Sequence, residues 1–173
     1  MTDWIKAMNP AGAIDTKEAA LAAARLSAVG MVLGAVRDSV GAWYSANGGA
    51  EASQRAIENL TGQVQSPEQV AQAAQFGLMA AGVVIVLQLI LAVVQWLKPN
   101  QVLPIIFLAL VVLALGGTLL SLTGSSMPGM ASLAPPMWTT VTTLVLMTAA
   151  FFMHIAGIRG ASALSKFRDA QAY

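Results

Sequence analysis

The sequence predicts an all-α integral membrane protein, in which four transmembrane helices form a single bundle. Hydrophobic residues make up 57% of the 173 residues and charged residues only 10%. A soluble domain carries about 25% charged residues, because its surface must be hydrated, so these charges cannot cover a water-soluble particle of this size. In addition, the segments 76–97, 103–122 and 138–158 each run for 20 residues or more without Asp, Glu, Lys or Arg, and about 20 apolar residues are enough to cross a bilayer.

The segment 19–44 is rich in alanine and glycine but contains charged residues, so it can form either a fourth transmembrane helix or an amphipathic helix on the membrane surface. Just before it, Asp15 and Glu18 have the spacing of a capping box and predict that the helix starts there. Two further patterns favour the transmembrane alternative: the distribution of positive charge and the positions of tryptophan.

The positively charged residues divide unequally between the two sides of a four-helix arrangement. One side holds seven of them, namely Lys6, Lys17, Arg25, Lys98, Arg159, Lys166 and Arg168, and the other holds two, Arg37 and Arg55. Cytoplasmic loops carry an excess of Lys and Arg, so this division places both termini in the cytoplasm. With three spans, the division becomes five against four and gives no orientation.

Tryptophan favours the boundary between membrane and water, where its ring contacts lipid and its N–H finds water. Trp43, Trp96 and Trp138 all fall at the ends of predicted spans, and Trp4 precedes the first one. The sequence therefore predicts four spans, with 19–44 as the first.

The second span belongs to a longer predicted helix, 67–97. Ser66 and Gln69 have the spacing of a capping box, and Pro67 occupies the first helical position, which proline favours. A helix of this length extends about 46 Å at 1.5 Å per residue, compared with roughly 30 Å for the hydrocarbon core of a bilayer. Its first turns are therefore expected to project beyond the lipid.

The second and third spans are separated by a very short connection. Lys98, Pro99 and Asn100 end the helix 67–97, and the next helix, 103–122, opens with a proline. A connection of this length joins antiparallel neighbours, so the two helices are predicted to form an αα-hairpin.

These segments belong to one polytopic domain, 1–173. Its predicted parts, in order, are a cytoplasmic N-terminus (1–15), the first span (19–44), an outer loop (45–66), the second span (67–97), the third span (103–122), a second outer loop (123–136), the fourth span (138–158) and a cytoplasmic tail (160–173). The tail is expected either to extend the fourth helix or to lie on the membrane surface. The alanine-rich composition and the lack of a cleavable signal peptide favour the inner membrane of a bacterium.

The composition excludes several kinds of chemistry. The chain contains no cysteine, which excludes disulfides, thiolate metal sites and cysteine nucleophiles. The single histidine, His154, cannot supply both axial ligands of a haem, and no cofactor is expected. A net charge of +1 gives no clustered basic surface for nucleic acid. Met127, Met130 and Met137 are soft ligands suited to Cu(I), but packing of their loop over the bundle end is the favoured interpretation.

Small residues and glutamines share one stripe of the second span. At intervals of seven, the stripe contains Ala74, Ala81, Gln88 and Gln95. A side-chain amide in the middle of a span needs a hydrogen-bond partner. The favoured interpretation is a packing seam, in which small residues let helices approach and glutamines bond across. The alternative is the polar lining of a pathway.

Three glycines predict a further close contact between helices. Gly30 and Gly34 form a GxxxG motif in 19–44, and Gly41 follows seven residues later. Glycine permits close backbone approach, so this face is predicted to pack against a helix of the same chain or of another subunit.

Arg37 and Asp38 are adjacent, so on a helix their side chains point about 100° apart and are not expected to pair with each other. They lie within about two turns of the predicted outer boundary. The favoured interpretation is that both reach the interface near Trp43 and Tyr44. The alternative is a charge site that faces the bundle interior, where an ionisable residue is taken to be functional.

His154 shares one face of the fourth span with Thr143. A histidine one turn from a cytoplasmic helix end usually meets the interface and the helix C-terminal dipole, and this interpretation is favoured. The alternative is a proton relay, since histidine titrates near neutral pH. Thr143 is a second candidate for lining a polar pathway.

Two functions are compatible with these features. The first is a non-enzymatic polytopic subunit that acts through helix packing, as a homo-oligomer or as an accessory part of a larger membrane complex. Its partners are the lipid bilayer and either other membrane subunits or copies of itself. The second is a small transporter or channel with a polar pathway lined by Gln88, Gln95 and Thr143. A membrane enzyme is least favoured, because it requires the charged pair 37–38 and His154 to converge.

Overall fold

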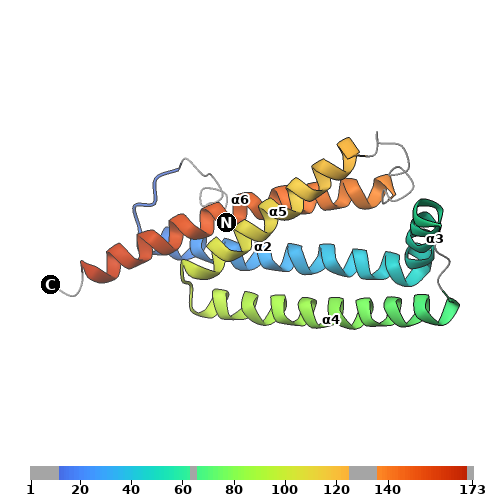
Figure 1. The fold of residues 1–173 in the computed structure, drawn as a ribbon. Helices are drawn as coiled ribbons and strands as arrows, with labels where there is room; N and C mark the ends of the chain where they lie inside the picture. The colour runs from blue at the N-terminus through green and yellow to red at the C-terminus, as the bar shows by residue number, and fades with distance from the viewer. Residues whose placement is uncertain (1–11, 63–65, 125–135, 171–173) are drawn as a thin grey trace.

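The computed structural model describes residues 12–62, 66–124 and 136–170, and these residues are almost entirely helical (Figure 1). The elements, in order, are α2 (Lys17–Tyr44), a short π-helical turn η1 (Ser45–Gly49), α3 (Ala50–Thr61), α4 (Pro67–Leu97), α5 (Val102–Gly124) and α6 (Met137–Asp169). Of these, α2, α4, α5 and α6 are long and apolar enough to cross a membrane. The prediction of four helices with the length and composition of transmembrane spans is confirmed.

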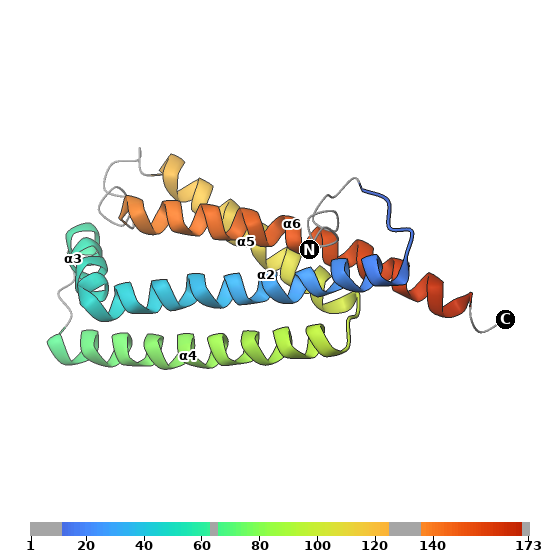
Figure 2. The same ribbon diagram turned by 180° about the vertical axis from the view of Figure 1, so that it is seen from behind.

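Helix α2 lies at the centre of the bundle, between α6 on one side and α4 on the other, and α5 packs against α6 (Figures 1 and 2). Small residues let α2 and α6 approach closely. Gly160 lies against the backbone of Ala20 and Ala24, where a Cβ atom would overlap it. Gly157 lies against Ser27 in a similar way. This contact between the first and last long helices is therefore intolerant of a larger side chain.

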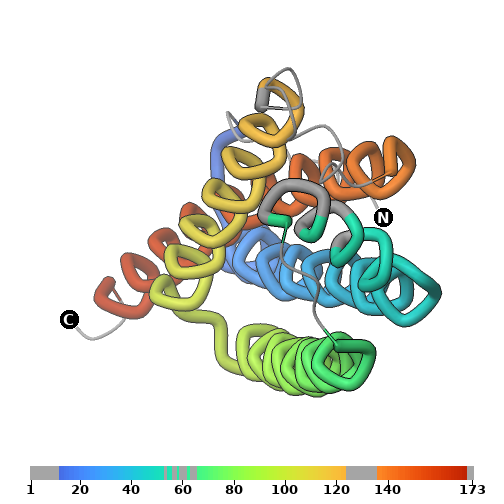
Figure 3. Tube along the Cα trace, turned by 45° about the vertical axis from the view of Figure 1, so that its right-hand side comes forward, coloured from blue at the N-terminus to red at the C-terminus, as the bar shows by residue number. Residues whose placement is uncertain are grey.

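The structure does not show the hairpin predicted for α4 and α5. At their short connection, Ala92 of α4 and Phe107 of α5 share an apolar cluster with Ala28 and Met31 of α2. Beyond this point α5 diverges from α4 and crosses the bundle to α6, where Val111 is buried (Figures 1 and 3). Beyond the connection, apolar side chains of α5 pack against α6. Gln88 and Gln95 of α4, in contrast, form hydrogen bonds with α2. Neighbours in the sequence therefore separate in space.

Gln95 fixes the connection between α4 and α5. Its fully buried side chain donates from Nε2 to the carbonyl oxygens of Ala24 and Asn100, at 3.2 and 3.1 Å. Its Oε1 accepts from the backbone N–H of Asn100 at 3.4 Å. Asn100 in turn accepts, through Oδ1, from the N–H of Leu103 in the first turn of α5 at 3.0 Å. One amide thus ties the end of α4 and the start of α5 to α2.

The starts of α4 and α2 differ in how well the sequence predicts them. At α4 the capping box is confirmed, with Gln69 N–H donating to Ser66 Oγ at 3.3 Å and Ser66 N–H donating to Gln69 Oε1 at 3.2 Å. At α2 the predicted cap is wrong. Thr16, rather than Asp15, has the extended backbone of an N-cap, and its side chain accepts from Ala19 N–H at 3.1 Å.

The two ends of the bundle differ in character. At the aromatic end, defined by Trp43, Tyr44 and Trp138, the first two rings each lie edge-on to the third, with centroids 6.1 Å apart. At the connection end, where α4 joins α5, the Arg25 guanidinium lies 5.2 Å from the Trp96 ring centroid and donates to the Trp96 carbonyl oxygen at 3.2 Å. Helix α3 lies across the aromatic end (Figures 1 and 2). Trp4 lies outside the described residues.

Helix α6 continues to Asp169, well beyond the predicted end of the fourth span at residue 158. The segment predicted as a tail, 160–173, is therefore helical as far as Asp169. Gly160 does not end the helix, because it serves the contact with α2. Helix α2 begins and α6 ends at the connection end of the bundle (Figure 1).

Candidate binding cavity

The first two glycines of α2 face different helices of the same chain. A Cβ atom on Gly30 would lie 3.1 Å from the His154 ring of α6, and one on Gly34 would lie 3.3 Å from Oε1 of Gln88 in α4. Among the described residues, no atom lies within 4 Å of a Cβ placed on Gly41. The GxxxG motif is thus used for contacts inside the chain.

The seven-residue stripe of α4 divides into two halves. Gln95 and Gln88 hydrogen-bond to α2, through the backbone of Ala24 and the side chain of Asp38. Ala74 and Ala81 instead line an open space. The stripe therefore serves packing toward the connection end and faces a cavity toward the aromatic end.

A charged hydrogen-bond network joins α2 to α4. Arg37 Nη1 donates to Asp38 Oδ1 at 2.7 Å, and Gln88 Nε2 donates to Asp38 Oδ2 at 2.6 Å. The expectation that Arg37 and Asp38 do not pair is wrong. Their Cα–Cβ bonds point in different directions, but the arginine side chain is long enough to fold back onto its neighbour. Pairing compensates two charges in apolar surroundings, where an unpaired one is costly.

The network borders a cavity of about 830 Å³ in the half of the bundle nearer the aromatic end. The cavity is lined by residues of α2, of α5 and α6, of α4 (the α4 wall), and by Ser45, Ala50 and Gln54 of η1 and α3. Helix α5 diverges from α4 in this half of the bundle (Figure 3), and residues of both helices line the cavity. Ligand pockets measure about 300–1,000 Å³, so the cavity has the size of a small-molecule site.

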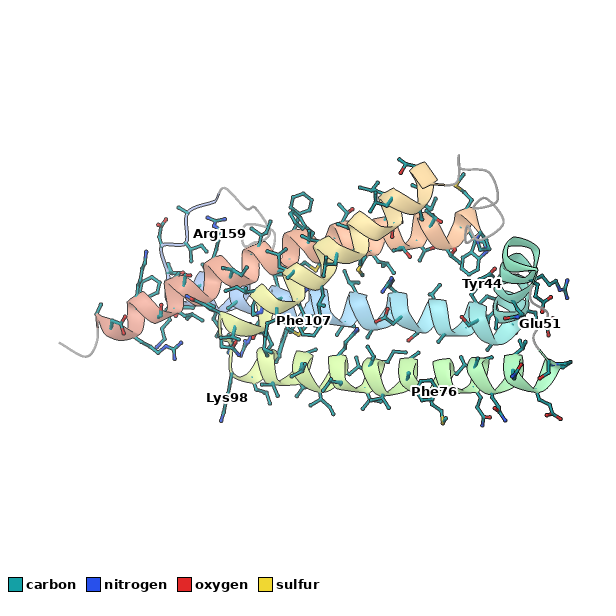
Figure 4. All side chains as sticks on the ribbon, viewed as in Figure 1. Tyr44, Glu51, Phe76, Lys98, Phe107 and Arg159 are labelled. Carbon is teal, nitrogen blue, oxygen red and sulfur yellow. The ribbon has the colours of Figure 1, made fainter. Side chains whose placement is uncertain are left out.

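The lining of the cavity combines polar side chains with small apolar ones. The polar lining residues are Arg37, Asp38, Tyr44, Ser45, Gln54, Thr118, Ser121, Thr139, Thr140 and Thr143. On the α4 wall, Ala73, Gly77 and Ala81 follow one another at intervals of four. On another face of α4, Phe76 points away from the other helices and is 71% exposed (Figure 4). Helix α4 therefore has one face toward the cavity and another away from the bundle.

Toward the connection end the bundle is closed. Ala28, Met31, Ala92 and Phe107 pack together there and are buried. Gln95 lies beyond this cluster and does not line the cavity. The residues predicted to line one pathway are thus not brought together: Thr143 lines the cavity, Gln88 lies at its edge and Gln95 belongs to the connection.

His154 lies in the core, and the prediction that it meets the interface is wrong. It is fully buried, its Nδ1 lies 2.7 Å from Ser27 Oγ in a hydrogen bond, and its ring stacks on Phe107 with centroids 5.9 Å apart. The sequence predicts that the fourth span ends at residue 158, whereas α6 continues to Asp169. His154 Nε2 has no hydrogen-bond partner in the described part of the chain.

The three groups considered for an enzyme do not converge. His154 faces Ser27 and Gly30 of α2. Arg37 and Asp38 lie seven residues or more beyond Gly30, which is about 10 Å along the helix. The predicted methionine cluster is not described, since Met127 and Met130 lie outside the described residues.

The hydroxyl side chains of α5 and α6 were not singled out from the sequence, apart from Thr143. Thr118, Ser121, Thr139 and Thr140 all line the cavity. Hydroxyl residues are common in apolar helices, where they bond back to the preceding turn, so their presence alone does not indicate a site. What these residues share is a position in the lining of one cavity. That property depends on the packing and is not visible in the sequence.

Comparisons of the chain with protein-family models, with curated proteins and with solved structures give no match. Its function is therefore argued from its own residues.

Proposed function

We propose that this chain is a non-enzymatic integral membrane protein that binds a small amphipathic molecule in the cavity between α4, α5 and α6. Insertion in a membrane is supported by the large apolar side chains on the outside of the bundle. Phe76, Leu113 and Leu120, for example, are 71–72% exposed and favour a hydrocarbon solvent. The unequal division of positive charge supports an orientation with both termini in the cytoplasm of a bacterium. In this orientation the cavity lies in the outer half of the membrane.

The observation that carries the proposal is the charged network beside the cavity. Ionisable residues in membrane-spanning helices are costly and typically mark ligand or ion pathways. Here Arg37 and Asp38 are held to a second helix by Gln88, next to a space of ligand size. Packing of α2 against α4 alone needs neither charge, because Gln95 and small residues already join the two helices.

Binding fits the chemistry of the lining better than catalysis. The titratable side chains that line the cavity are Arg37, Asp38 and Tyr44. Arginine stays protonated in proteins, and Asp38 already accepts two hydrogen bonds. Neither group is poised to act as a general base or a nucleophile.

A binding protein or a carrier is favoured over an open channel. The buried cluster around Met31 and Phe107 closes the bundle between the cavity and the connection end. Passage of a solute would require these helices to separate, as they do in an alternating-access carrier.

The proposal is tested by filling the cavity with a large side chain. Ala81 lines the cavity, whereas its neighbour Ala80 is exposed and does not. The variants Ala81→Trp and Ala80→Trp are purified in nanodiscs, and retained small molecules are counted by native mass spectrometry. We expect wild type and Ala80→Trp to retain a molecule that Ala81→Trp has lost. Equal retention by both variants, or no retained molecule in any of the three, contradicts the proposal.

A second candidate function, a subunit of a larger assembly, is favoured by the small residues of the α4 wall. Ala73, Gly77 and Ala81 have the spacing that lets another helix approach closely, and they face the cavity rather than a helix of the described chain. Because the chain contains no cysteine, single-cysteine variants give clean cross-links. A partner cross-linked through Ala73→Cys but not through Phe76→Cys supports this function. Equal cross-linking at both positions indicates random collision and contradicts it.

A further inference from the structure

We propose that the cavity binds the head group of an anionic amphipath, a carboxylate or a phosphate on one hydrocarbon chain, through Arg37 and Thr143. This inference rests on the function proposed above and names the chemical class of its ligand. Two features of the lining support it: the hydrogen-bond donors that have no partner within the described part of the chain, and the apolar surface of α4.

The charged pair presents its cation to the cavity more than its anion. Each carboxylate oxygen of Asp38 already accepts a hydrogen bond, one from Arg37 and one from Gln88. A guanidinium has five N–H donors, and Arg37 directs a single nitrogen to Asp38. The Arg37 side chain is 36% exposed and that of Asp38 is 19% exposed. The remaining N–H groups suit a carboxylate or a phosphate, which arginine often binds through two parallel bonds.

Four of the seven hydroxyl groups of the lining, including that of Thr140, already donate to backbone carbonyl oxygens. Thr118, Ser121 and Thr139 donate to carbonyl oxygens three or four residues earlier, at 2.6–2.8 Å. Thr143, in contrast, has no hydrogen-bond partner among the described residues and lines the same cavity. Its O–H is free to donate. The donors left for a ligand are thus Arg37 and the hydroxyls of Thr143, Tyr44 and Ser45. Of these, Arg37 and Thr143 lie farther from the aromatic end, seven residues before Tyr44 and five residues after Trp138, and a cation with a hydroxyl favours an oxyanion.

The rest of the site suits a hydrocarbon chain. The α4 wall is apolar, and it contains Val70, Leu78 and Val84 beside its small residues. Helices α4 and α5 do not pack along their length, so in the described part of the chain no helix contact closes that side (Figure 1). A chain attached to the head group can follow the α4 wall and leave between α4 and α5 into lipid.

The depth of Arg37 favours a ligand with a compact head group. Arg37 lies seven residues before Tyr44, which is about 10 Å along the helix. Trp43, Tyr44 and Trp138 mark the expected membrane boundary. A head group on Arg37 therefore lies below the level of the surrounding lipid head groups. The cavity must enclose it on its own, and a compact oxyanion meets this requirement better than a bulky zwitterion.

The test compares four amphipaths that share one sixteen-carbon chain: palmitate, hexadecyl phosphate, hexadecanol and hexadecyltrimethylammonium. Their affinities are measured by equilibrium competition against radiolabelled palmitate, on the full chain in phosphatidylcholine nanodiscs. We expect at least one of the two anions to bind about ten-fold more tightly than the alcohol or the cation, the difference made by one charge-assisted hydrogen bond. Preference for palmitate indicates a free fatty acid as the source, and preference for hexadecyl phosphate indicates a phosphate-bearing lipid.

Substitutions at the two donors identify the site. Arg37→Gln is expected to weaken anion binding about ten-fold and to leave hexadecanol unchanged, while Arg37→Lys keeps part of the preference. Thr143→Val is expected to weaken anion binding by a smaller factor, and Thr143→Ser to restore it. Because Arg37→Gln leaves Asp38 without its cation, the double variant Arg37→Gln/Asp38→Asn is measured beside it. This variant keeps the net charge and an acceptor for Gln88, and it must lose the anion preference as well.

Equal affinity for the alcohol and both anions, or unchanged anion affinity in the double variant, overturns the inference. The variant Ala81→Trp then separates this failure from failure of the proposed function. If Ala81→Trp weakens binding of all four compounds, the cavity remains a binding site without a preference for anions. If Ala81→Trp binds all four like wild type, the cavity is not the site and the proposed function fails too.

Discussion

Gln88 of α4 and Asp38 of α2 are joined by a hydrogen bond of 2.6 Å between Nε2 and Oδ2. Toward the connection end, Ala92 and Gln95 pack α4 against α2. Toward the aromatic end, the corresponding residues of α4, such as Ala81, face the cavity. The bond between Gln88 and Asp38 therefore marks the level at which the seam between the two helices ends and the cavity begins.

Gln88→Leu is expected to destabilise the protein by about 1–2 kcal/mol, because Asp38 loses a charge-assisted hydrogen bond and Leu offers no replacement. The measurement is a double-mutant cycle with Asp38→Asn, using equilibrium unfolding in mixed micelles. Asparagine keeps an oxygen that can accept from Gln88 but removes the charge, so the cycle measures the charge-assisted part of the bond, which we expect to be about 1 kcal/mol. Additive effects of the two substitutions would contradict a charge-assisted bond.

Gly160→Ala is expected to destabilise the contact between α2 and α6 by about 1–3 kcal/mol, the usual cost of overpacking. Its new Cβ atom would overlap the backbone of Ala20 and Ala24, which cannot move aside as a flexible side chain can. The matched control is Gly116→Ala in α5, where no atom among the described residues lies within 4 Å of the new Cβ. We expect this control to be neutral or stabilising, since alanine favours a helix over glycine by up to about 1 kcal/mol. Thermal unfolding of the two variants side by side checks the prediction, and equal stability contradicts it.

Helices α4, α5 and α6 could be predicted from the sequence because their signal is local. Uncharged segments of sufficient length, and the capping box at Ser66 and Gln69, depend only on residues close together in the chain. The partners of Gln88 and Gln95 were predicted only as some facing helix, since periodicity shows which residues share a stripe but not what lies opposite. Their actual partners on α2 are 50 and 71 residues away in the sequence.

The cavity and the position of His154 could not be predicted, for a different reason. Both depend on how helices cross, and crossing is decided by sums of many small contacts. The short connection favoured a hairpin, yet α5 diverges from α4 to pack with α6, and residues of both α4 and α5 line the cavity. Helix α6 continues beyond its apolar segment and still packs closely against α2 at Gly160, so His154 lies in the core rather than near a helix end.

Ser27→Ala is expected to destabilise the protein by about 1–3 kcal/mol, because His154 then has a buried ring nitrogen without a partner. Nδ1 loses the hydrogen bond of 2.7 Å to Ser27 Oγ, while Nε2 already has no partner in the described chain. The double variant Ser27→Ala/His154→Phe removes both polar groups, and its phenyl ring can stack on Phe107. We expect the double variant to recover most of the lost stability in thermal unfolding. A double variant less stable than Ser27→Ala would show that the histidine contributes more than this bond.

The orientation of the chain, and whether α2 spans, can be read from three single-cysteine variants, since the chain has no cysteine of its own. Glu51 of α3 and Lys98, which follows α4, lie near opposite ends of α4 (Figure 4). Asp15 precedes α2, and all three side chains are exposed. With four spans and cytoplasmic termini, a membrane-impermeant maleimide labels Glu51→Cys in intact cells, and it labels Asp15→Cys and Lys98→Cys only after permeabilisation. If α2 lay on the surface, residue 15 would instead share the accessibility of residue 51. Residues 51 and 98 differ in their accessibility to the maleimide in either case, because α4 separates them. The labelling of residue 15 therefore distinguishes four spans from three. The opposite pattern, with residues 15 and 98 labelled in intact cells, keeps four spans but reverses the orientation argued from the seven-to-two division of positive charge.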